Sequence, residues 1–355
     1  MAAEGNDGDL YEDGPAAGSR APILLTHFDG AMDAGGAGGL AVSQMLGSLD
    51  SRRVATFDSD MLVDYRSHRP LVTVEDWVTT DVEVPEIALD LVHDDLGHPI
   101  LLLHGPEPDA RWETFAQVVS DLAHEAGVEI SFSLHGIPSG VPHTRPTPVH
   151  VQATDASLVP DQPKLAGTMQ FPAPMTTFLQ ARLASSGIEG VALLASVPYY
   201  LAENAYPGAA SALLTRLSSL ADLSLPVGDL ERGASEDLDE VSKLIAGNTE
   251  VAGTIEALER HYDAMTGGSD SGPTPSLPEG VWDESSTEDI GDVIEAYLAN
   301  VTKREKGLEG EDEGEDAAPE GHDDNGAETV ADVLARLRGR GSGTDQPGTP
   351  RHRAD

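Results

Sequence analysis

Two aspartates and five glycines follow the first apolar run of the chain, in the stretch HFDGAMDAGGAGG (residues 27–39). A loop of this kind could cradle a phosphate group. Gly30 and Gly35 have the spacing of a P-loop, but Gly36 and Ala37 stand where that loop needs Lys and then Ser or Thr. Without the lysine, the P-loop interpretation is rejected.

The same stretch also resembles the glycine-rich fingerprint of dinucleotide-binding domains. Gly36, Gly38 and Ala41 have the spacing of the fingerprint, and Asp58 follows about 20 residues later, as that motif requires. The first fingerprint glycine, however, belongs in the turn directly after the strand, whereas Gly36 lies well beyond it. The small residues therefore predict close packing of a helix on the sheet in preference to nucleotide binding.

The two aspartates remain candidates for a ligand site. Asp29 follows the first predicted strand, and Asp33 is placed to cap a helix that begins at Ala34. Ligands of open α/β sheets bind at the carboxyl ends of the strands, where Asp58, His104 and His135 are also expected. Capping and turn formation are the first expectation for each residue taken singly.

A second polar region is the proline-rich loop LHGIPSGVPHTRPTPVH (residues 134–150). It carries His135, His143 and Arg145, and long, stiff, polar loops are often functional. Its Ser139 is one position too late for the GxSxG nucleophile elbow, and no HExxH or other spaced metal-binding motif is present. The sequence contains no recognisable catalytic triad, and neither a metal nor a cofactor is predicted.

The elements that position these residues alternate between short β-type runs and longer stretches of helical period, which predicts an α/β fold with a largely parallel sheet flanked by helices. The apolar runs 100–104 and 191–197 are predicted to be central strands, and a polar loop is expected between residues 58 and 98. Asp109 is expected to cap a helix that Gly127 ends. The other helices are predicted at 33–49, 172–186, 205–221 and 234–263, the last broken at Gly247-Asn248.

The composition divides the chain into four segments. We expect a disordered tail at 1–20, an α/β domain at 21–232, a helical extension at 233–265, and a linker with short helices and an acidic disordered tail at 266–355. The last segment includes predicted helices near 286–305 and 327–340. The second is interpreted as a nascent helix in the tail, because an isolated helix of this length is marginal in water, and a helix that docks on a partner is the alternative.

Charge and cysteine content exclude several classes of function. The chain has 62 acidic and 21 basic residues in 355, a formal net charge of -41, which argues against nucleic acid and anionic membranes as partners. It has no cysteine, so disulfides, thiolate metal sites and cysteine nucleophiles are impossible. No signal peptide or membrane-spanning run is recognised, and a cytoplasmic protein is expected.

Five motifs in the same order along the chain resemble the PAC2 family of proteasome assembly chaperone 2 and its archaeal and actinobacterial relatives. They are HFDGAMDAG, DYRSHRP (64–70), HGPEPDARWETF (104–115), GIPSGVPHTRP (136–146) and VPYYLAENAYPGAASALL (197–214). The resemblance covers residues 20 to 262 and is strongest to the long actinobacterial branch. It implies a core similar to nucleoside phosphorylases, with a helical extension and a tendency to form homo-oligomers.

Two features depart from the family pattern. Tyr199 stands where relatives often have histidine, and the chain ends in Arg353-Ala354-Asp355, not in the hydrophobic-Tyr-any tripeptide of relatives that dock on proteasome rings. A direct role of this tail in docking is therefore not expected.

The resemblance implies a non-enzymatic protein-binding or assembly-chaperone-like factor, with protein partners in proteasome assembly or quality control. The alternative is an enzyme or sensor for a nucleoside-like or phosphorylated ligand, in which Arg145 holds the anion and His143 or a carboxylate transfers a proton. The candidate residues for a ligand or partner cleft are Asp29, Asp33, Arg66, Arg69, Glu107, His143, Arg145 and Tyr199.

Overall fold

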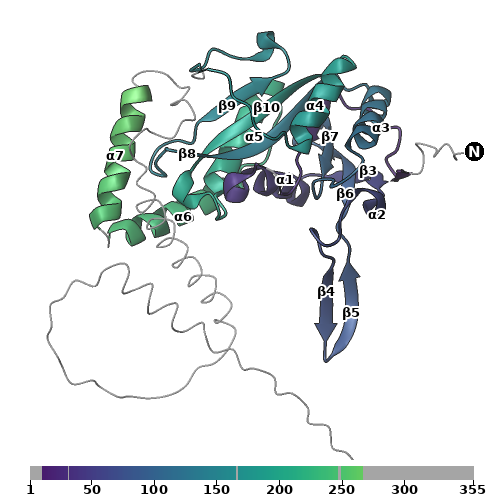
Figure 1. Cartoon of the computed structure of the whole chain (residues 1–355), viewed down its shortest axis with the longest axis horizontal. Coiled ribbons are helices and arrows are strands. Elements are labelled where there is room, and N and C mark those ends of the chain that lie inside the picture. Colours follow the sequence, from purple (N-terminus) through teal and green to yellow (C-terminus); the bar gives the residue numbers. More distant parts are fainter. Residues whose placement is uncertain (1–9, 31, 165–166, 247–248, 267–355) are drawn as a thin grey trace, which may run out of the picture. The chain divides into compact units, whose positions relative to one another are not determined.

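The computed structural model describes residues 10–30, 32–164, 167–246 and 249–266 (Figure 1). Its main sheet has eight strands in the order β1-β3-β6-β7-β2-β8-β10-β9, and β4 and β5 form a separate two-stranded sheet. The strands are β1 Tyr11–Asp13, β2 Ile23–Thr26, β3 Ser51–Phe57, β4 Leu71–Glu75, β5 Val78–Glu83, β6 Ile87–His93, β7 Pro99–His104, β8 Ile130–Ser139, β9 Val149–Ala153 and β10 Glu189–Pro198. The helices are α1 Ala37–Ser48, α2 Ser59–Leu62, α3 Trp112–Ala126, α4 Met175–Ser185, α5 Pro207–Ala221, α6 Gly228–Ala246 and α7 Thr249–Thr266.

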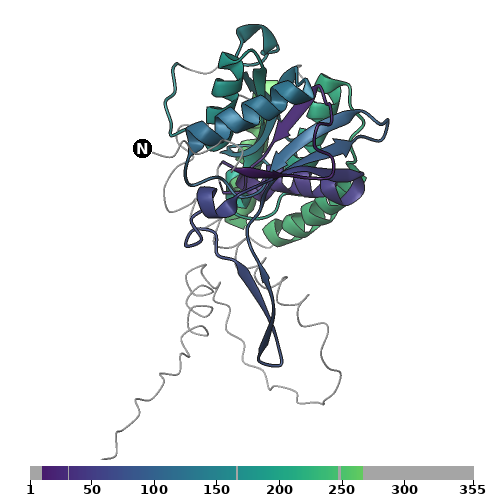
Figure 2. The ribbon, with the colours of Figure 1, turned by 90° about the vertical axis from the view of Figure 1, so that its right-hand side faces the viewer.

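The predicted α/β fold is confirmed. Strands β7, β2, β8 and β10 are parallel neighbours, and antiparallel strands complete the sheet on both sides. Helices α3 and α4 pack together on one face, and α1 and α5 pack together on the other (Figure 2). Because β7 and β2 are buried on both faces, their sequences are continuous apolar runs.

The run 100–104 forms β7, which lies in the middle of the sheet as predicted. The run 191–197 belongs to β10, which has neighbours on both sides but lies next to the edge strand β9. The continuous apolar run therefore identified β10 as an internal strand, but it could not give the position of β10 in the strand order of the sheet.

Order begins earlier in the chain than predicted. Leu10 is buried, and β1 pairs antiparallel with β3, so residues 10–20 are not a disordered tail. A three-residue strand is too short to show alternation, and its pairing depends on a partner about 40 residues away. Residues 1–9 lie outside the described part of the chain, as does the segment 267–355 on which the linker, late-helix and acidic-tail predictions fall.

The prediction of a polar loop between residues 58 and 98 is also wrong. This segment contains α2, the hairpin of β4 and β5, and the buried strand β6. Asp90 disguises β6 because a carboxylate is unusual inside a sheet; here its oxygens accept from Arg53 Nε at 2.7 Å and bond His104 Nε2 at 2.8 Å. These partners offset the cost of burying the charge.

Helix boundaries agree better with the sequence. Gly127 ends α3 in the left-handed conformation, as predicted, but Asp109 does not cap it. Two helices, α6 and α7, lie on either side of Gly247-Asn248, and these two residues are themselves outside the described part. No helix in the described residues is long and apolar enough to cross a membrane.

Asp94 connects the turn between β6 and β7 to the chain after α5. Its buried carboxylate accepts from the N–H groups of Leu96 (3.0 Å), His98 (2.7 Å) and Ser224 (2.8 Å), and it also contacts the His98 ring. Burial alone would raise the pKa of Asp94, but the Ser224 and His98 hydrogen bonds outweigh it and lower the pKa to about 2.

Asp94→Asn is expected to lower the free energy of unfolding at pH 7 by about 1–2 kcal/mol. Because the folded-state pKa is depressed, this contribution is present above about pH 4 and is lost as the pH falls toward 2. Urea unfolding at pH 7 and at pH 2.5 measures both values, with Asp95→Asn at the exposed neighbour as control. An equal loss at both pH values would contradict the assignment.

Candidate functional site

Asp33 joins the start of α1 to the end of β8. Its carboxylate accepts from Gly38 N–H (2.7 Å) and Gly39 N–H (3.0 Å) in the first turn of α1, and from Gly136 N–H at 3.1 Å. Asp33 therefore satisfies N–H groups in the first turn of α1, as a capping side chain does. The helix predicted from Ala34 begins at Ala37, however, after the short 3-10 turn Ala34–Gly36, and its N-cap residue is Gly36.

The small residues after Asp33 allow α1 to lie directly on the sheet, as the sequence predicted. A Cβ atom at Gly38 would lie 2.8 Å from the Leu134 carbonyl oxygen and would overlap the His27 ring. A Cβ at Gly136 would collide with the Ala34 carbonyl. These glycines are therefore needed for the close approach of the backbones.

His27 lies buried between α1 and the strand ends. Its Nδ1 is 3.2 Å from the Leu134 carbonyl oxygen, which can only accept, so Nδ1 carries the proton. Its Nε2 faces Asp29 Oδ1 at 3.7 Å and Asp33 Oδ2 at 3.6 Å. Burial opposes the charged form, but the nearby carboxylates of Asp29 and Asp33 outweigh it and raise the pKa of His27.

His135 lies on β8 and behaves in the opposite way. Its Nε2 is 3.0 Å from Ser133 Oγ and 3.3 Å from Thr176 Oγ1. Burial, reinforced by the charge of His27, lowers the pKa of His135 to about 4, so its ring is neutral at pH 7. The pKa values of the two histidines thus shift in opposite directions, because only His27 has carboxylate neighbours.

Glu107 lies next to Asp29 because the loops after β2 and β7 run together. Glu107 N–H donates to the Asp29 carbonyl at 3.1 Å, and Asp29 N–H donates to the Gly105 carbonyl at 2.9 Å. The Glu107 carboxylate accepts from Met175 N–H at 2.5 Å and so caps α4. Asp29 is the exposed member, with 70% of its side chain accessible.

The two arginines of the DYRSHRP motif do not lie with the carboxylates at the strand ends. Arg66 is exposed and pairs with Asp64 at 2.8 Å, and Arg69 is also exposed. The loop is held by Asp109, whose Oδ2 accepts from Asp64 N–H at 2.7 Å and lies 3.5 Å from the His68 ring. Asp109 therefore organises this loop and does not cap α3 as predicted.

Arg145 belongs to a second group, which attaches α7 to the proline-rich loop. Its guanidinium donates to both oxygens of Asp263 at 2.8 Å and to Glu259 at 3.3 Å. Tyr262 OH donates to the Pro146 carbonyl at 2.9 Å. The anion that Arg145 holds is therefore a pair of carboxylates on α7.

His143 and Tyr199 lie around the buried ring of Tyr200. The hydroxyl of Tyr200 accepts from His143 N–H at 2.9 Å and is 2.8 Å from His143 Nδ1. Burial lowers the pKa of His143 to about 4 and raises that of Tyr200, so both are neutral at pH 7. Tyr199 packs edge-on against Tyr200 with ring centroids 5.3 Å apart.

The structure brings Asp29, Asp33 and Glu107 together at the strand ends and places His143 and Arg145 with other partners. A cavity of about 260 Å³ is lined by His143 and Arg145, and a cavity of about 430 Å³ is lined by neither; Asp29, Asp33 and Glu107 line neither of these two cavities. Within the described residues, no three His, Asp or Glu side chains are arranged to hold a metal ion.

Sequence reasoning missed two features that matter for function. His27 was not singled out, although its place directly after a buried apolar run placed it at a strand end. The hairpin LVTVEDWVTTDVE (71–83) was also missed, although its β-branched alternation around Asp76-Trp77 is a recognisable hairpin pattern.

Comparison with protein families gives a match over most of the α/β domain and part of the helical extension. The model described as "PAC2 family" matches residues 27–245, which is more than half of the chain. The chain belongs to the PAC2 family. All five motifs that suggested the resemblance begin within this range.

Solved structures of similar proteins support the same assignment. A Mycobacterium tuberculosis protein of unknown function is 36% identical with a TM-score of 0.68, the match covering 74% of this chain and 92% of that one. A PAC2 family protein from Streptomyces avermitilis is 30% identical (TM-score 0.57; 66% and 99% covered). A proteasome-assembly chaperone homologue from Mycobacterium tuberculosis is 27% identical (TM-score 0.61; 66% and 99% covered). Among curated proteins, none matches this PAC2 chain.

The raised pKa of His27 gives a test of the strand-end geometry. In an NMR pH titration, we expect the pKa of His27 to lie above its ordinary value of 6.5 and to fall in Asp29→Asn, because Asp29 makes the strongest favourable contact with the ring. Asp29 is exposed, so this change leaves the capping by Asp33 intact. Asp81→Asn on the distant hairpin is the control, and an unchanged His27 pKa in Asp29→Asn would refute the assignment.

The contact between Arg145 and α7 gives a second test. Arg145→Ala is expected to accelerate amide hydrogen exchange in Thr249–Thr266 several-fold, because it removes the bidentate bond to Asp263. Exchange in the central strands should not change. Arg182→Ala, which breaks a similar pair with Glu113, is the control and should leave α7 unaffected.

Proposed function

We propose that this chain is a non-enzymatic, protein-binding factor of the assembly-chaperone type, that it works as a homo-oligomer, and that its partner is proteasomal. Membership of the PAC2 family and the likeness to a proteasome-assembly chaperone homologue support this proposal. The observation that carries it is the hairpin of β4 and β5, which we call the arm (residues 71–83).

The arm projects away from the main sheet in both views (Figures 1 and 2), and every residue of its strands is exposed. Val72 and Val82 are cross-strand partners, and Val74 lies two residues further along the same face. Their exposed fractions are 56%, 50% and 56%. The arm thus presents an apolar face that the described residues do not cover.

The arm is not expected to be stable without a packing partner. Isolated two-stranded hairpins are marginal in water unless one face packs against something. Its two-residue turn places Asp76 at φ 47° and Trp77 at φ 67°, a conformation that favours glycine and costs other residues about 1–2 kcal/mol. Trp77 is 99% exposed, so no burial within the described chain offsets this cost.

A second copy of the chain is the occupant that best fits the apolar face. Glu75, Asp81 and Glu83 lie on the opposite face of the arm by strand alternation, together with their cross-strand partners Leu71 and Val78, and the arm has no basic residue. Two arms that meet through their valines keep these carboxylates in water and apart from one another.

The arm is tested by replacing its apolar residues. The combined variant Val72→Thr, Trp77→Ser and Val82→Thr is expected to shift the protein from oligomer to monomer in light scattering coupled to size-exclusion chromatography. The circular dichroism spectrum should not change, because these residues contribute nothing to the core. Leu96→Ser with Val159→Thr, which alters exposed apolar residues elsewhere, is the control.

The proteasomal part is tested separately, with purified proteasome subunits from the same organism in a co-sedimentation and assembly assay. We expect the wild type to bind assembly intermediates and the arm variant to bind them more weakly. A wild type that is monomeric at all concentrations would overturn the oligomer. Absence of binding to any proteasome subunit would overturn the proteasomal partner.

A further inference from the structure

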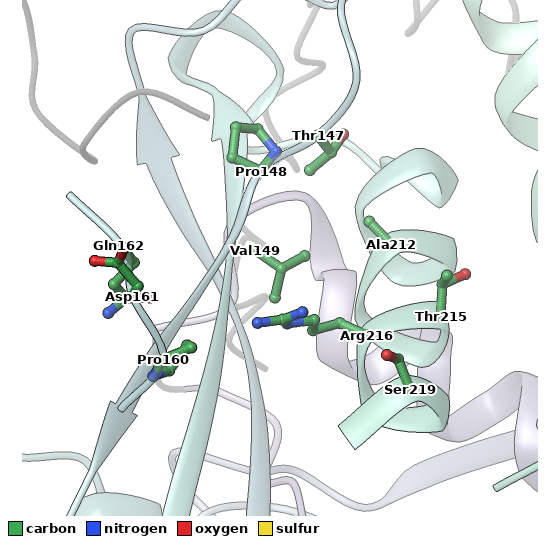
Figure 3. A pocket seen from close by; sticks show the side chains of 10 residues that line it. All are labelled: Thr147, Pro148, Val149, Pro160, Asp161, Gln162, Ala212, Thr215, Arg216 and Ser219. Carbon is green, nitrogen blue, oxygen red and sulfur yellow. The ribbon is translucent and has the colours of Figure 1, made fainter. Parts of the chain in front are cut away.

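The larger cavity, of about 430 Å³, lies between α5, the edge strand β9 and the loop around Pro160 (Figure 3). Its volume is within the range of small-molecule pockets. Pro148, Val149 and Pro160 form apolar walls, and Arg216 extends from α5 towards Val149 between them. We propose that this cavity binds a small monocarboxylate with an apolar body, whose acid group pairs with Arg216.

Arg216 is half-buried and has no ion-pair partner among the described residues. In the described part of the chain three arginines are half-buried, and two of them are paired: Arg53 with Asp90 and Glu86, and Arg145 with Asp263 and Glu259. No described carboxylate lies within ion-pair distance of Arg216, and its buried Nε has no hydrogen-bond partner there. Burying part of a guanidinium without such partners costs free energy. The lack of a carboxylate partner is unusual in a chain with 62 acidic residues.

The cavity is also built in advance of any ligand. Its outer wall is fixed because Gln162 bonds the free edge of β9, accepting from Val151 N–H at 3.0 Å and donating to the Val151 carbonyl at 2.7 Å. Thr215 and Ser219, one turn apart on α5, also line the cavity and add hydroxyl groups to it. A bound acid would therefore meet the guanidinium of Arg216 together with hydroxyl donors.

The other residues that line the cavity determine which class of anion fits it. Asp161, exposed on the loop, is the one acidic residue lining the cavity. Its charge repels dianions more strongly than monoanions, and the prolines and valine favour an apolar body. A monocarboxylate such as isovalerate fits these conditions better than inorganic phosphate. The inference is independent of the arm, which lies elsewhere in the fold.

Calorimetric and NMR titrations of the full chain with isovalerate, isovaleramide and inorganic phosphate test the proposal. We expect millimolar binding of isovalerate, and at least tenfold weaker binding of the neutral amide and of phosphate. Arg216→Gln should weaken isovalerate binding at least tenfold, whereas Arg182→Gln, on another helix, should not. Ala212→Met, which fills the cavity and keeps Arg216, should also abolish binding, so the result does not depend on one variant.

Several results would contradict the proposed binding site. No binding of isovalerate up to its solubility limit, equal binding of the amide, or unchanged binding in Arg216→Gln would overturn the site. Tighter binding of phosphate would overturn the monocarboxylate class. None of these outcomes bears on the oligomeric state or on proteasome binding, which are measured separately.

Discussion

The carboxylate of Asp33 is the contact on which the strand-end region depends. It accepts hydrogen bonds from α1 and from β8, two elements about 100 residues apart in the chain. A buried N–H without a partner costs as much as a lost hydrogen bond, so α1 can start against the sheet only where such an acceptor is available. Gly38 and Gly136 follow from the same constraint, because a side chain on either would separate the backbones that Asp33 joins.

This arrangement leaves the polar residues of the strand ends mostly engaged with one another. Asp33 and Glu107 cap helices, and His135 contacts Ser133 and Thr176. The His27 ring lies beside the exposed Asp29, and neither the cavity of about 430 Å³ nor that of about 260 Å³ is lined by this pair. The hydrogen bonds of Asp33 and Glu107 thus hold α1 and α4 against the strand ends.

The C-terminal helices depend on a different use of charge. Arg145 is one of few basic residues in a strongly acidic chain, and it collects two carboxylates from α7 at once. Beneath it, the neutral His143 and Tyr200 bond each other, so no uncompensated charge is buried under the helix. The proline-rich loop is therefore the base on which α7 is held, and its polarity, which suggested a ligand site, has a structural purpose.

The sequence by itself determined the α/β class, the close packing of the glycine-rich helix, the cap at Asp33, the end of α3 at Gly127 and the family. These features depend on local periodicity, on residue types that only one backbone conformation tolerates, and on motifs that survive divergence. The tertiary structure decided what depends on distant partners. It supplied the strand order, the burial of Asp90 in β6, the pairing of Arg145 with α7, and the isolation of Arg216. Each is set by a group far away in the chain, and neither periodicity nor spacing carries that information.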